Sequence, residues 1–406
     1  MQEGCSLIEE ASSYRWVMVA VTWLMMFSMG LSWFSVTPME AKLGVTYAEF
    51  GFLVALVPLA LVILCIPGGL LADRFGVKRT VLIGGLLMGI FGLLRGFASS
   101  FALLATTMFL CGAGYAIAYP NMPKVTGVWF PLKQYALASG IMFTGMEVGM
   151  ASSFILTPTV LLPITGSPRG VFITVGIFAL AMTLIWILLA KERPANFKSG
   201  KSPSLAETQG VPFRKSLSVV LRNKQMWMVM ITCLFLLAPQ IGLFGFLQTI
   251  LTQKGMDSTT AGLLTSTIIL FMIPGSFITP MISDRVGKRK PFIWATSIAA
   301  AIALYFTGTT LGLPLWISAI FYGFLIGSMA PIILAMPVEL MGPSYSATAG
   351  GLTLVGGYVG AMIAPWLAGY FSTATGSFTP AVVMCTGFTV VEAICGLLVK
   401  ETCTEQ

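Results

Sequence analysis

Long apolar runs, separated by short polar segments, follow one another along the whole chain. A helix needs about 20 apolar residues to cross the ~30 Å hydrocarbon core of a bilayer. Backbone groups in lipid must be hydrogen-bonded internally, so a helix is the spanning element that suits such runs. The pattern predicts an all-α membrane protein of twelve transmembrane helices, at approximately residues 16–37, 50–71, 80–98, 101–121, 137–162, 170–190, 226–250, 260–282, 291–310, 314–337, 346–371 and 379–399.

One long polar segment, residues 191–224, interrupts the series and divides the predicted helices six and six. We therefore expect an N-terminal six-helix bundle at residues 1–194, a cytoplasmic linker at 195–222 and a C-terminal six-helix bundle at 223–406. A short surface helix is expected within the polar segment, near Leu217–Leu221.

Two sequence matches indicate that the bundles arose by duplication. LADRFGVKR at 71–79 recurs as ISDRVGKRK at 282–290, and YALASG at 135–140 recurs as YSATAG at 345–350. The first match is displaced by 211 residues (73 to 284) and the second by 210 (135 to 345). Two matches at nearly one offset predict two pseudo-symmetric halves with a shared site near the middle of the membrane, which is a common transporter plan.

The charged residues indicate how the chain lies in the membrane. Only 9% of the residues are charged, against about 25% in soluble proteins. If both termini lie on one side, nineteen of the 23 Lys and Arg residues fall in segments on that side. Positive charge marks the cytoplasmic side, so we expect both termini in the cytoplasm and the protein in a plasma (inner) membrane.

The sequence lacks the motifs typical of enzymes, metal-binding proteins and nucleic-acid-binding proteins. The seven cysteines are scattered and the chain has no histidine, so neither a metal site nor a disulfide framework is indicated. We found no nucleophile–base pair, phosphate loop or basic–aromatic nucleic-acid patch. The chain is therefore not expected to be an enzyme or to bind a cofactor, a metal or a nucleic acid. Its expected partners are the lipid bilayer, a small-molecule substrate and a coupling proton or sodium ion, with the chain as a monomer.

The repeated motif GGLLADRFGVKRT, residues 68–80, is expected to form the loop after the second helix, and its match is expected after the eighth. Glycines allow a sharp turn at the membrane surface, and the charged residues can form a network that breaks when the halves rock. Basic loops also fix topology alone, but the recurrence in both halves favours gating. The gating candidates are Gly69, Asp73, Arg74, Gly76, Lys78, Arg79, Asp284, Arg285, Gly287 and Lys288.

At this motif the chain resembles the major facilitator superfamily, whose signature between helices 2 and 3 is Gly-x-Leu-Ala-Asp-Arg-x-Gly-Arg-Arg/Lys. The resemblance covers the whole chain and implies a secondary transporter that works by alternating access. Many members carry a helix-4 arginine that is linked to proton coupling. Met108 stands at that position here, so the sequence does not indicate this form of coupling. The matching residues are Gly69, Leu71, Ala72, Asp73, Arg74, Gly76 and Lys78.

A weaker resemblance is to the feline leukaemia virus subgroup C receptor branch, which includes carriers of choline and ethanolamine and has been linked to haem. It rests on residues 15–38, 91–95, 122–140 and 145–149. A helix-1 tryptophan of the branch would match Trp33, and Glu147 would stand for its helix-5 glutamine. The branch's helix-7 tyrosine and helix-11 glutamine would fall at Gly245 and near Gly357, so the substrate need not carry over.

An acidic residue, Glu147, lies about ten residues into the fifth run, which is ~15 Å along a helix. A charge at such a depth costs roughly 3 kcal/mol or more. Three interpretations stay open: a neutral acid bonded to a neighbouring helix, a partner for a cationic substrate, or a carrier of a coupling proton or sodium ion. Trp33 is either an interfacial anchor or a cavity wall that would attract a quaternary ammonium together with Glu147.

Further site candidates follow from the superfamily resemblance, which implies that helices 1, 4, 7 and 10 line the cavity. Lys124, at the cytoplasmic mouth, could provide the counter-charge for an anion. Glu392 is expected to make an inter-helix hydrogen bond or to lie near the cytoplasmic edge, and Arg95 to extend to the outer surface. The other candidates for substrate binding are Tyr115, Tyr119, Asn121, Gln240, Gln248 and Tyr322.

The sequence therefore predicts a secondary transporter of a small organic solute, with a cationic amine slightly favoured as substrate. Transport of an organic anion or monocarboxylate is the alternative within the same fold. A receptor or sensor that does not transport is the alternative from another class.

Overall fold

The computed structural model describes residues 14–192, 213–342 and 344–402. Twelve helical segments within them are long and apolar enough to cross a membrane, and none of these residues forms a strand. The predicted all-α, twelve-helix fold class is therefore confirmed. Of the expected linker, residues 195–212 lie outside the described residues, and the expected surface helix is α10 (Phe213–Arg222).

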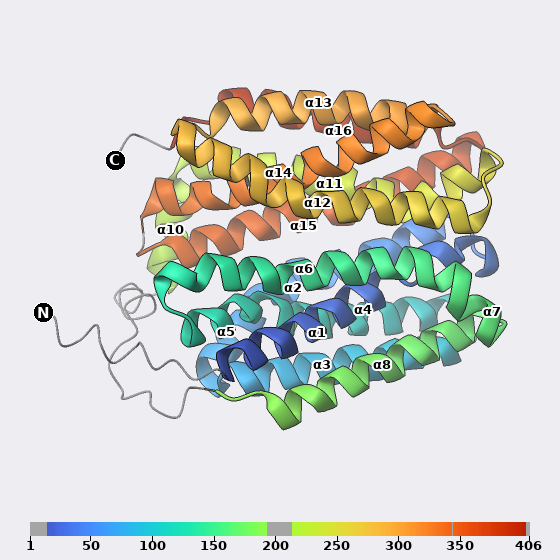
Figure 1. Ribbon diagram of the computed structural model, residues 1–406, viewed down its shortest axis with the longest axis horizontal. Helices are drawn as coiled ribbons and strands as arrows, with labels where there is room; N and C mark the ends of the chain where they lie inside the picture. The colour runs from blue at the N-terminus through green and yellow to red at the C-terminus, as the bar shows by residue number, and fades with distance from the viewer. Residues whose placement is uncertain (1–13, 193–212, 343, 403–406) are drawn as a thin grey trace, which may run out of the picture.

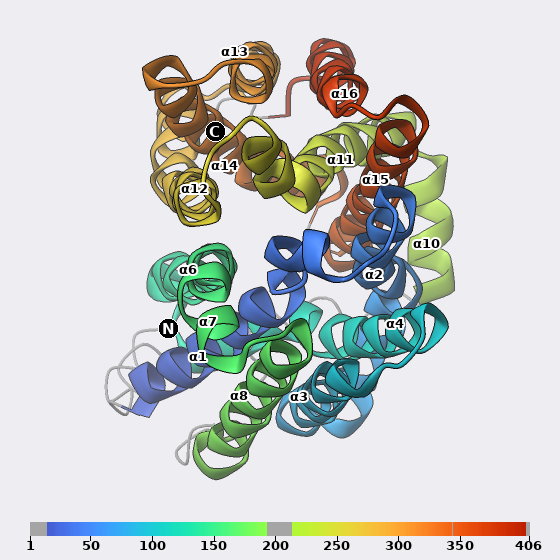
Figure 2. The same cartoon turned by 90° about the vertical axis from the view of Figure 1, so that its right-hand side faces the viewer.

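The helices form two bundles that lie side by side (Figures 1 and 2). The first bundle contains α1 (Tyr14–Phe34), α2 (Tyr47–Phe75), α3 (Val77–Leu94), α4 (Phe101–Ala118), α5 (Met122–Trp129), α6 (Leu132–Leu156), α7 (Leu162–Thr165) and α8 (Pro168–Leu189), with the short turns η2 (Thr37–Lys42), η3 (Arg95–Phe97), η4 (Tyr119–Asn121) and η5 (Thr157–Leu161). The second contains α11 (Lys224–Gln253), α12 (Ser258–Val286), α13 (Lys290–Thr309), α14 (Leu313–Met341), α15 (Ser346–Thr375) and α16 (Thr379–Leu398).

Equivalent helix ends in the two bundles are capped by equivalent residues. Thr46 accepts a hydrogen bond from the backbone at the start of α2, and Asp257, 211 positions later, does the same for α12. Glu192, which follows α8, accepts from the first backbone N–H groups of α3. Glu401, which follows α16, accepts from the backbone at the start of α13. Carboxylates stabilise helix N-termini. Because the two bundles have these caps at matching helix ends, the duplication extends to the capping interactions.

The repeated motif differs from its expected form as a loop. Helix α2 continues to Phe75 and α12 to Val286, so most of each motif forms the last turns of a helix. The sharp turns occur at Gly76 and Gly287, with φ angles of +87° and +67°. The positive φ at Gly76 favours glycine, and a Cβ there would also displace the Glu192 carboxylate, whose Oε1 would lie 2.5 Å away.

The motif face is the end of the molecule that carries Gly76 and Gly287, and the opposite face is the end that carries η2 and η5. Helix α1 begins and α16 ends at the motif face, on the left of Figure 1. The bundles touch closely near the opposite face. A Cβ on Gly51 would lie 2.2 Å from the Pro365 carbonyl oxygen, and one on Gly369 would lie 2.1 Å from that of Tyr47. Small residues thus let α2 and α15 approach at backbone distance.

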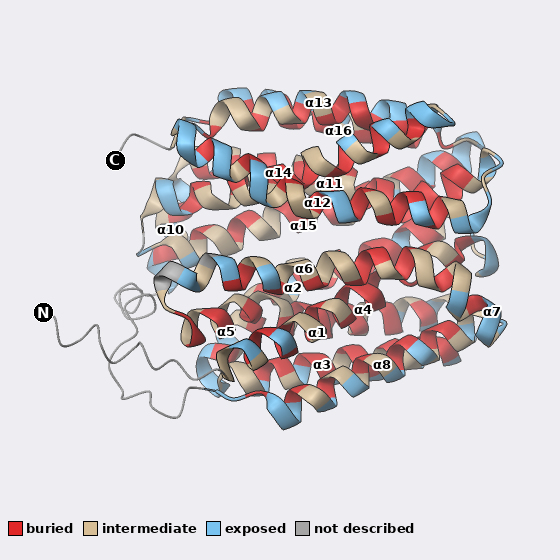
Figure 3. Cartoon of the chain, in the orientation of Figure 1, coloured by how far each residue is buried: buried red, intermediate tan, exposed pale blue. Residues whose placement is uncertain are grey.

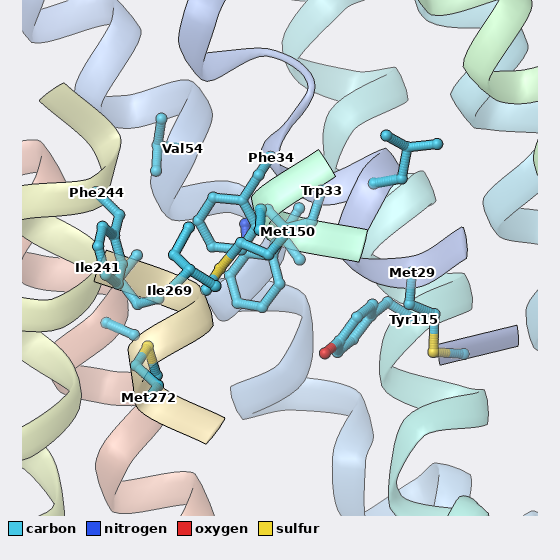
Figure 4. Packing of buried hydrophobic residues seen from close by; sticks show 14 of the residues in the cluster. Met29, Trp33, Phe34, Val54, Tyr115, Met150, Ile241, Phe244, Ile269 and Met272 are labelled. Carbon is cyan, nitrogen blue, oxygen red and sulfur yellow. The ribbon is translucent and has the colours of Figure 1, made fainter. Parts of the chain in front are cut away.

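Apolar side chains fill the space between the bundles next to this contact. The rings of Phe34, Phe154 and Phe244 form a chain across the interface, with centroid separations of 5.9 and 6.4 Å. Phe50 meets Phe246 edge to face at 5.4 Å. Figure 4 shows Phe34 and Phe244 of this layer from close by, with Ile241 of α11 and Ile269 of α12 nearby. Because these rings exclude water, they seal the molecule toward the opposite face.

The outward surface of both bundles is apolar. Exposed residues follow the outer sides of the helices in Figure 3, and they include large apolar side chains such as Leu188, Phe321 and Ile302, which are 70%, 58% and 55% exposed. An apolar surface of this extent requires an apolar environment. The spans and this surface together identify an integral membrane protein.

Replacing Gly51 with alanine should weaken the contact between α2 and α15, because the added Cβ would overlap with the Pro365 carbonyl. Overpacking of this kind costs about 1–3 kcal/mol, which corresponds to a roughly five- to 150-fold larger open fraction. The measurement is the rate at which a maleimide labels Val54→Cys, a position that is 1% exposed, in a chain whose other cysteines are replaced.

Gly387→Ala is the matched control, because Gly387 also lies inside a helix but nothing stands within 4 Å of the Cβ it would gain. The control should label at the rate of the parent chain. Equal labelling rates for the two alanine variants would show that the close approach at Gly51 does not hold this face shut.

Candidate functional site

A cavity of about 2120 Å³ lies between the two bundles. Its walls reach from the charged side chains of the motif face, including Asp73, Lys124 and Asp284, inward to Trp33 and Phe34. The phenylalanine layer bounds it toward the opposite face. The cavity is therefore open at one end of the molecule and closed at the other.

Helix α6 brings Glu147 into the cavity wall. Gly145 and Gly149 pack this helix against α1, because a Cβ on either would lie 2.5 or 2.1 Å from a backbone oxygen of that helix. The Glu147 Oε2 atom is buried and has no hydrogen-bond partner. None of the ion pairs formed by the described residues includes Glu147. The carboxyl group therefore keeps an unused acceptor at the cavity wall.

Aromatic rings stand beside this carboxyl group. Trp33 meets Tyr115 edge to face at 5.3 Å, and Tyr115 stacks on Tyr119 at 5.1 Å. Both tyrosines lie within electrostatic range of Glu147. The Trp33 Nε1 atom is buried without an acceptor, and the Tyr115 hydroxyl contacts Met146 Sδ at 3.3 Å. The first bundle thus provides an aromatic wall with one unused acceptor and one unused donor.

The second bundle supplies the facing wall. Gln240 of α11 lines the cavity, and its amide nitrogen lies 3.9 Å from Met272 Sδ. Tyr358 of α15 also lines it, and its hydroxyl faces that of Tyr119 in the first bundle. Three methionines, Met146, Met150 and Met272, occupy the walls between these polar groups. A solute in this cavity would contact both bundles at once.

Charged side chains gather at the mouth. Lys124 and Asp73 form an ion pair at 2.5 Å within the first bundle, and Arg289 pairs with Asp284 and Glu339 within the second. Among the described residues, no ion pair joins the two bundles at this face, in keeping with its open state. The other basic residues of the mouth are Arg74, Lys78, Arg79 and Lys191.

The structure brings most of the predicted substrate-binding residues together, but three of them lie outside the cavity wall. Asn121 is fully buried and its amide donates to the carbonyl oxygens of Gly68 and Ile117. Gln248 donates to Ser258 near the opposite face. Tyr322 is fully buried and its hydroxyl has no partner. The predicted residues that line the cavity are Trp33, Tyr115, Tyr119, Lys124, Glu147 and Gln240, with Gly69, Asp73, Arg74, Gly76, Lys78, Arg79 and Asp284 of the motifs. Arg285, Gly287 and Lys288 are not part of the wall.

The expectation that Arg95 extends to the outer surface is wrong. Its side chain is 2% exposed. The guanidinium group donates to the carbonyl and hydroxyl oxygens of Ser32, both at 3.1 Å, and stacks on the Phe172 ring at 4.9 Å. The carboxyl ends of α1 and α3 meet here, and unpaired carbonyls at helix C-termini stabilise a cation.

Glu392 lies inside the second bundle. It is fully buried on α16, and neither of its carboxyl oxygens has a hydrogen-bond partner. The Ser297 hydroxyl faces it but donates to the Ile293 carbonyl at 2.8 Å. Ser297 belongs to α13, so Glu392 has a hydroxyl group of another helix as its neighbour, and it lies six residues before the end of α16 at the motif face.

Three residues were not singled out from the sequence: Tyr358, which lines the cavity, and the capping residues Glu192 and Glu401. Tyr358 lies on the eleventh span. The candidates from the sequence came from helices 1, 4, 7 and 10, which the family resemblance implies line the cavity. The isolated tyrosine in GGYVG was the available signal. Glu192 and Glu401 share a Lys-Glu pair after the last helix of each half, and that repeat pointed to their common capping role.

Similar proteins of known name are transporters. The chain is 24% identical over 364 residues to the "Probable sulfoacetate transporter SauU" of Cupriavidus necator, which covers 83% of this chain and 81% of that protein. It is 25% identical over 402 residues to the "Probable galactarate/D-glucarate transporter GarP" of Escherichia coli K12, covering 89% and 88%. It is 25% identical over 359 residues to "Monocarboxylate transporter 12-B" of Danio rerio, covering 81% and 74%.

Solved structures share the fold. A bacterial homolog of the human lysosomal transporter Spinster, in an inward-facing and unoccupied conformation, superposes with a TM-score of 0.75 at 17% identity, covering 96% of this chain and 97% of that one. A point mutant of the nucleoside transporter NupG gives a TM-score of 0.76 at 14% identity, covering 95% and 100%. A family model described as the Major Facilitator Superfamily matches residues 18–365 and 240–402. The chain belongs to the Major Facilitator Superfamily.

Proposed function

We propose that this transporter moves a small organic solute with a cationic amine-type group by alternating access. The motif face would be the cytoplasmic one, because most Lys and Arg residues gather there. The cavity would then be open to the cytoplasm. The membrane would be a plasma (inner) membrane, with both chain ends on the cytoplasmic side.

The observation that carries this proposal is the unpaired carboxyl group of Glu147 in the cavity wall. A charge removed from water without a partner is costly. A cationic solute would supply the missing partner, and a charge-assisted hydrogen bond of this kind contributes about 1.5–3 kcal/mol. The charged nitrogen atoms of the cavity wall belong to the mouth, so nothing in the central part would repel such a solute.

The aromatic wall supports the same substrate class. A cation over the face of a tryptophan or tyrosine ring gains about 0.5–2 kcal/mol from the ring quadrupole. Trp33, Tyr115 and Tyr119 stand together beside Glu147. The unused Trp33 Nε1–H would bind an oxygen atom of the solute, which favours an amino alcohol over a simple alkylamine.

Contacts from both bundles support alternating access. Glu147 and Trp33 belong to the first bundle, and Gln240 and Tyr358 belong to the second. A solute between them would draw the bundles together at the motif face, while the contact of α2 with α15 opens at the other. This is the rocking movement expected of duplicated halves around a fixed site.

Transport of an organic anion is the second candidate. The relatives SauU, GarP and monocarboxylate transporter 12-B are named for acids, and the cavity mouth is rich in basic side chains. Lys124 would then meet the solute, and Glu147 would carry a coupling proton. The named relatives are transporters, which gives no support to a receptor that does not transport.

Choline and ethanolamine should raise the thermal unfolding temperature of the purified protein, whereas acetate, lactate and sulfoacetate should not.

Glu147→Gln should bind the amines about ten- to 150-fold more weakly, because it removes a charge-assisted interaction of about 1.5–3 kcal/mol. Isothermal titration calorimetry on both proteins measures this ratio.

Glu392→Gln is the matched control for this measurement. It makes the same chemical change at a buried, unpaired acid that does not line the cavity, so amine affinity should stay at the parent value. If acids bind instead of amines, and Glu147→Gln abolishes their accumulation driven by a proton gradient in proteoliposomes, the anion candidate replaces the first proposal.

Substitution of Trp33 should weaken amine binding in the order Trp, Phe, Leu. The expected total loss is about two- to 30-fold, which corresponds to the 0.5–2 kcal/mol of a cation–π contact. A neutral isostere of choline, in which carbon replaces the ammonium nitrogen, should bind the three variants with a much flatter dependence. An identical dependence for charged and neutral ligands would mean that Trp33 acts by shape alone.

A further inference from the structure

A second acid, Glu40, lies between the bundles near the opposite face. It belongs to η2, which follows α1, and it is 5% exposed. Its Oε2 atom accepts a hydrogen bond from the Thr249 hydroxyl at 3.2 Å. Thr249 belongs to α11 and is 9% exposed. A carboxyl group of one bundle is thus enclosed against a hydroxyl group of the other.

No cation compensates this carboxyl group within the described residues. None of their ion pairs includes Glu40. Lys42, on the same turn, is exposed, and Lys254, at the end of α11, donates to the Gly308 carbonyl. The other elements packed against η2 are η5, which has no titratable residue, and α6, whose described acid Glu147 faces the cavity.

The burial of Glu40 depends on which face is closed. Its enclosure includes Thr249 of the second bundle, so separation of the bundles at the opposite face breaks the hydrogen bond and returns the carboxyl group to water. A carboxyl group without a cation is stable in the dry environment when neutral and in water when ionised. The two conformations therefore bind a proton at this atom with different affinities.

We propose that Glu40 is a proton-binding site that couples protonation to closure of the opposite face. The proton binds a carboxylate oxygen of Glu40 when that face is open to water. The neutral acid is then enclosed between the bundles, with Thr249 as its hydrogen-bond partner. Opening exposes the group again and releases the proton. No bond other than this O–H bond forms or breaks.

Linkage fixes the direction and the size of the effect. The closed form binds the proton more tightly, so acid favours closure and alkali favours opening. One proton changes the ratio of closed to open molecules by at most about tenfold per pH unit, between the proton affinities of the two forms. This inference rests on the alternating access of the proposed function, but not on the identity of the solute.

The distance across the opposite face tests the proposal. Spin labels at Ile164→Cys and Leu313→Cys, which are 78% and 72% exposed in the parent chain, report on the two bundles in a chain whose native cysteines are replaced. Double electron–electron resonance should show a growing short-distance population as the pH falls from about 8 to about 5. Glu40→Gln, which mimics the neutral acid, should keep the short distance across this range.

Glu49→Gln is the matched control, since Glu49 is an acid at the same face whose side chain accepts hydrogen bonds only from Thr46 of its own bundle. It should keep the pH dependence of the parent chain. The response should also survive in Glu147→Gln, which separates this inference from cation binding in the cavity. A parent chain without pH dependence, or a Glu40→Gln chain with the full response, would overturn the proposal.

Discussion

The two bundles touch at backbone distance at one end of the molecule, and the position of the cavity depends on this contact. The contact is possible because Gly51, Gly262 and Gly369 leave no side chain where the other bundle's carbonyl oxygens lie. Two rigid bundles that touch at one end must diverge toward the other, and the cavity is the space between them. The phenylalanine layer beside this contact closes that end, while the cavity reaches the surface at the motif face.

This arrangement gives the buried acids of the chain different environments. Glu147 stands at the wall of the cavity and keeps a free acceptor, whereas Glu40 is enclosed in the seam between the bundles. Glu392 is enclosed within one bundle and gains no water in either arrangement of rigid bundles. These positions support the roles proposed above: contact with solute for the first and a state-dependent proton for the second, while the third keeps a constant environment.

The sequence was sufficient for the fold because span length, loop charge and an internal repeat are properties of whole segments. It also named a shared cavity as one of the alternatives for Glu147 and Trp33. It could not show which side of each helix faces that cavity, because most of these helices are apolar all round and carry no polar stripe. Asn121 and Tyr322 were therefore expected at the solute and lie inside a bundle, Arg95 was expected at the surface and caps two helices, and Tyr358 was overlooked.

The methionines of the cavity wall have a consequence for selectivity. Met146, Met150 and Met272 line the cavity, and methionine side chains are unbranched and polarisable, so they can rearrange around solutes of different outline. Such walls discriminate poorly between homologues that differ by a methylene group. Discrimination must then come from the fixed polar groups, chiefly one carboxylate and one indole N–H. Under the proposed function, the transporter would sort its solutes by charge and tolerate variety in their carbon skeletons.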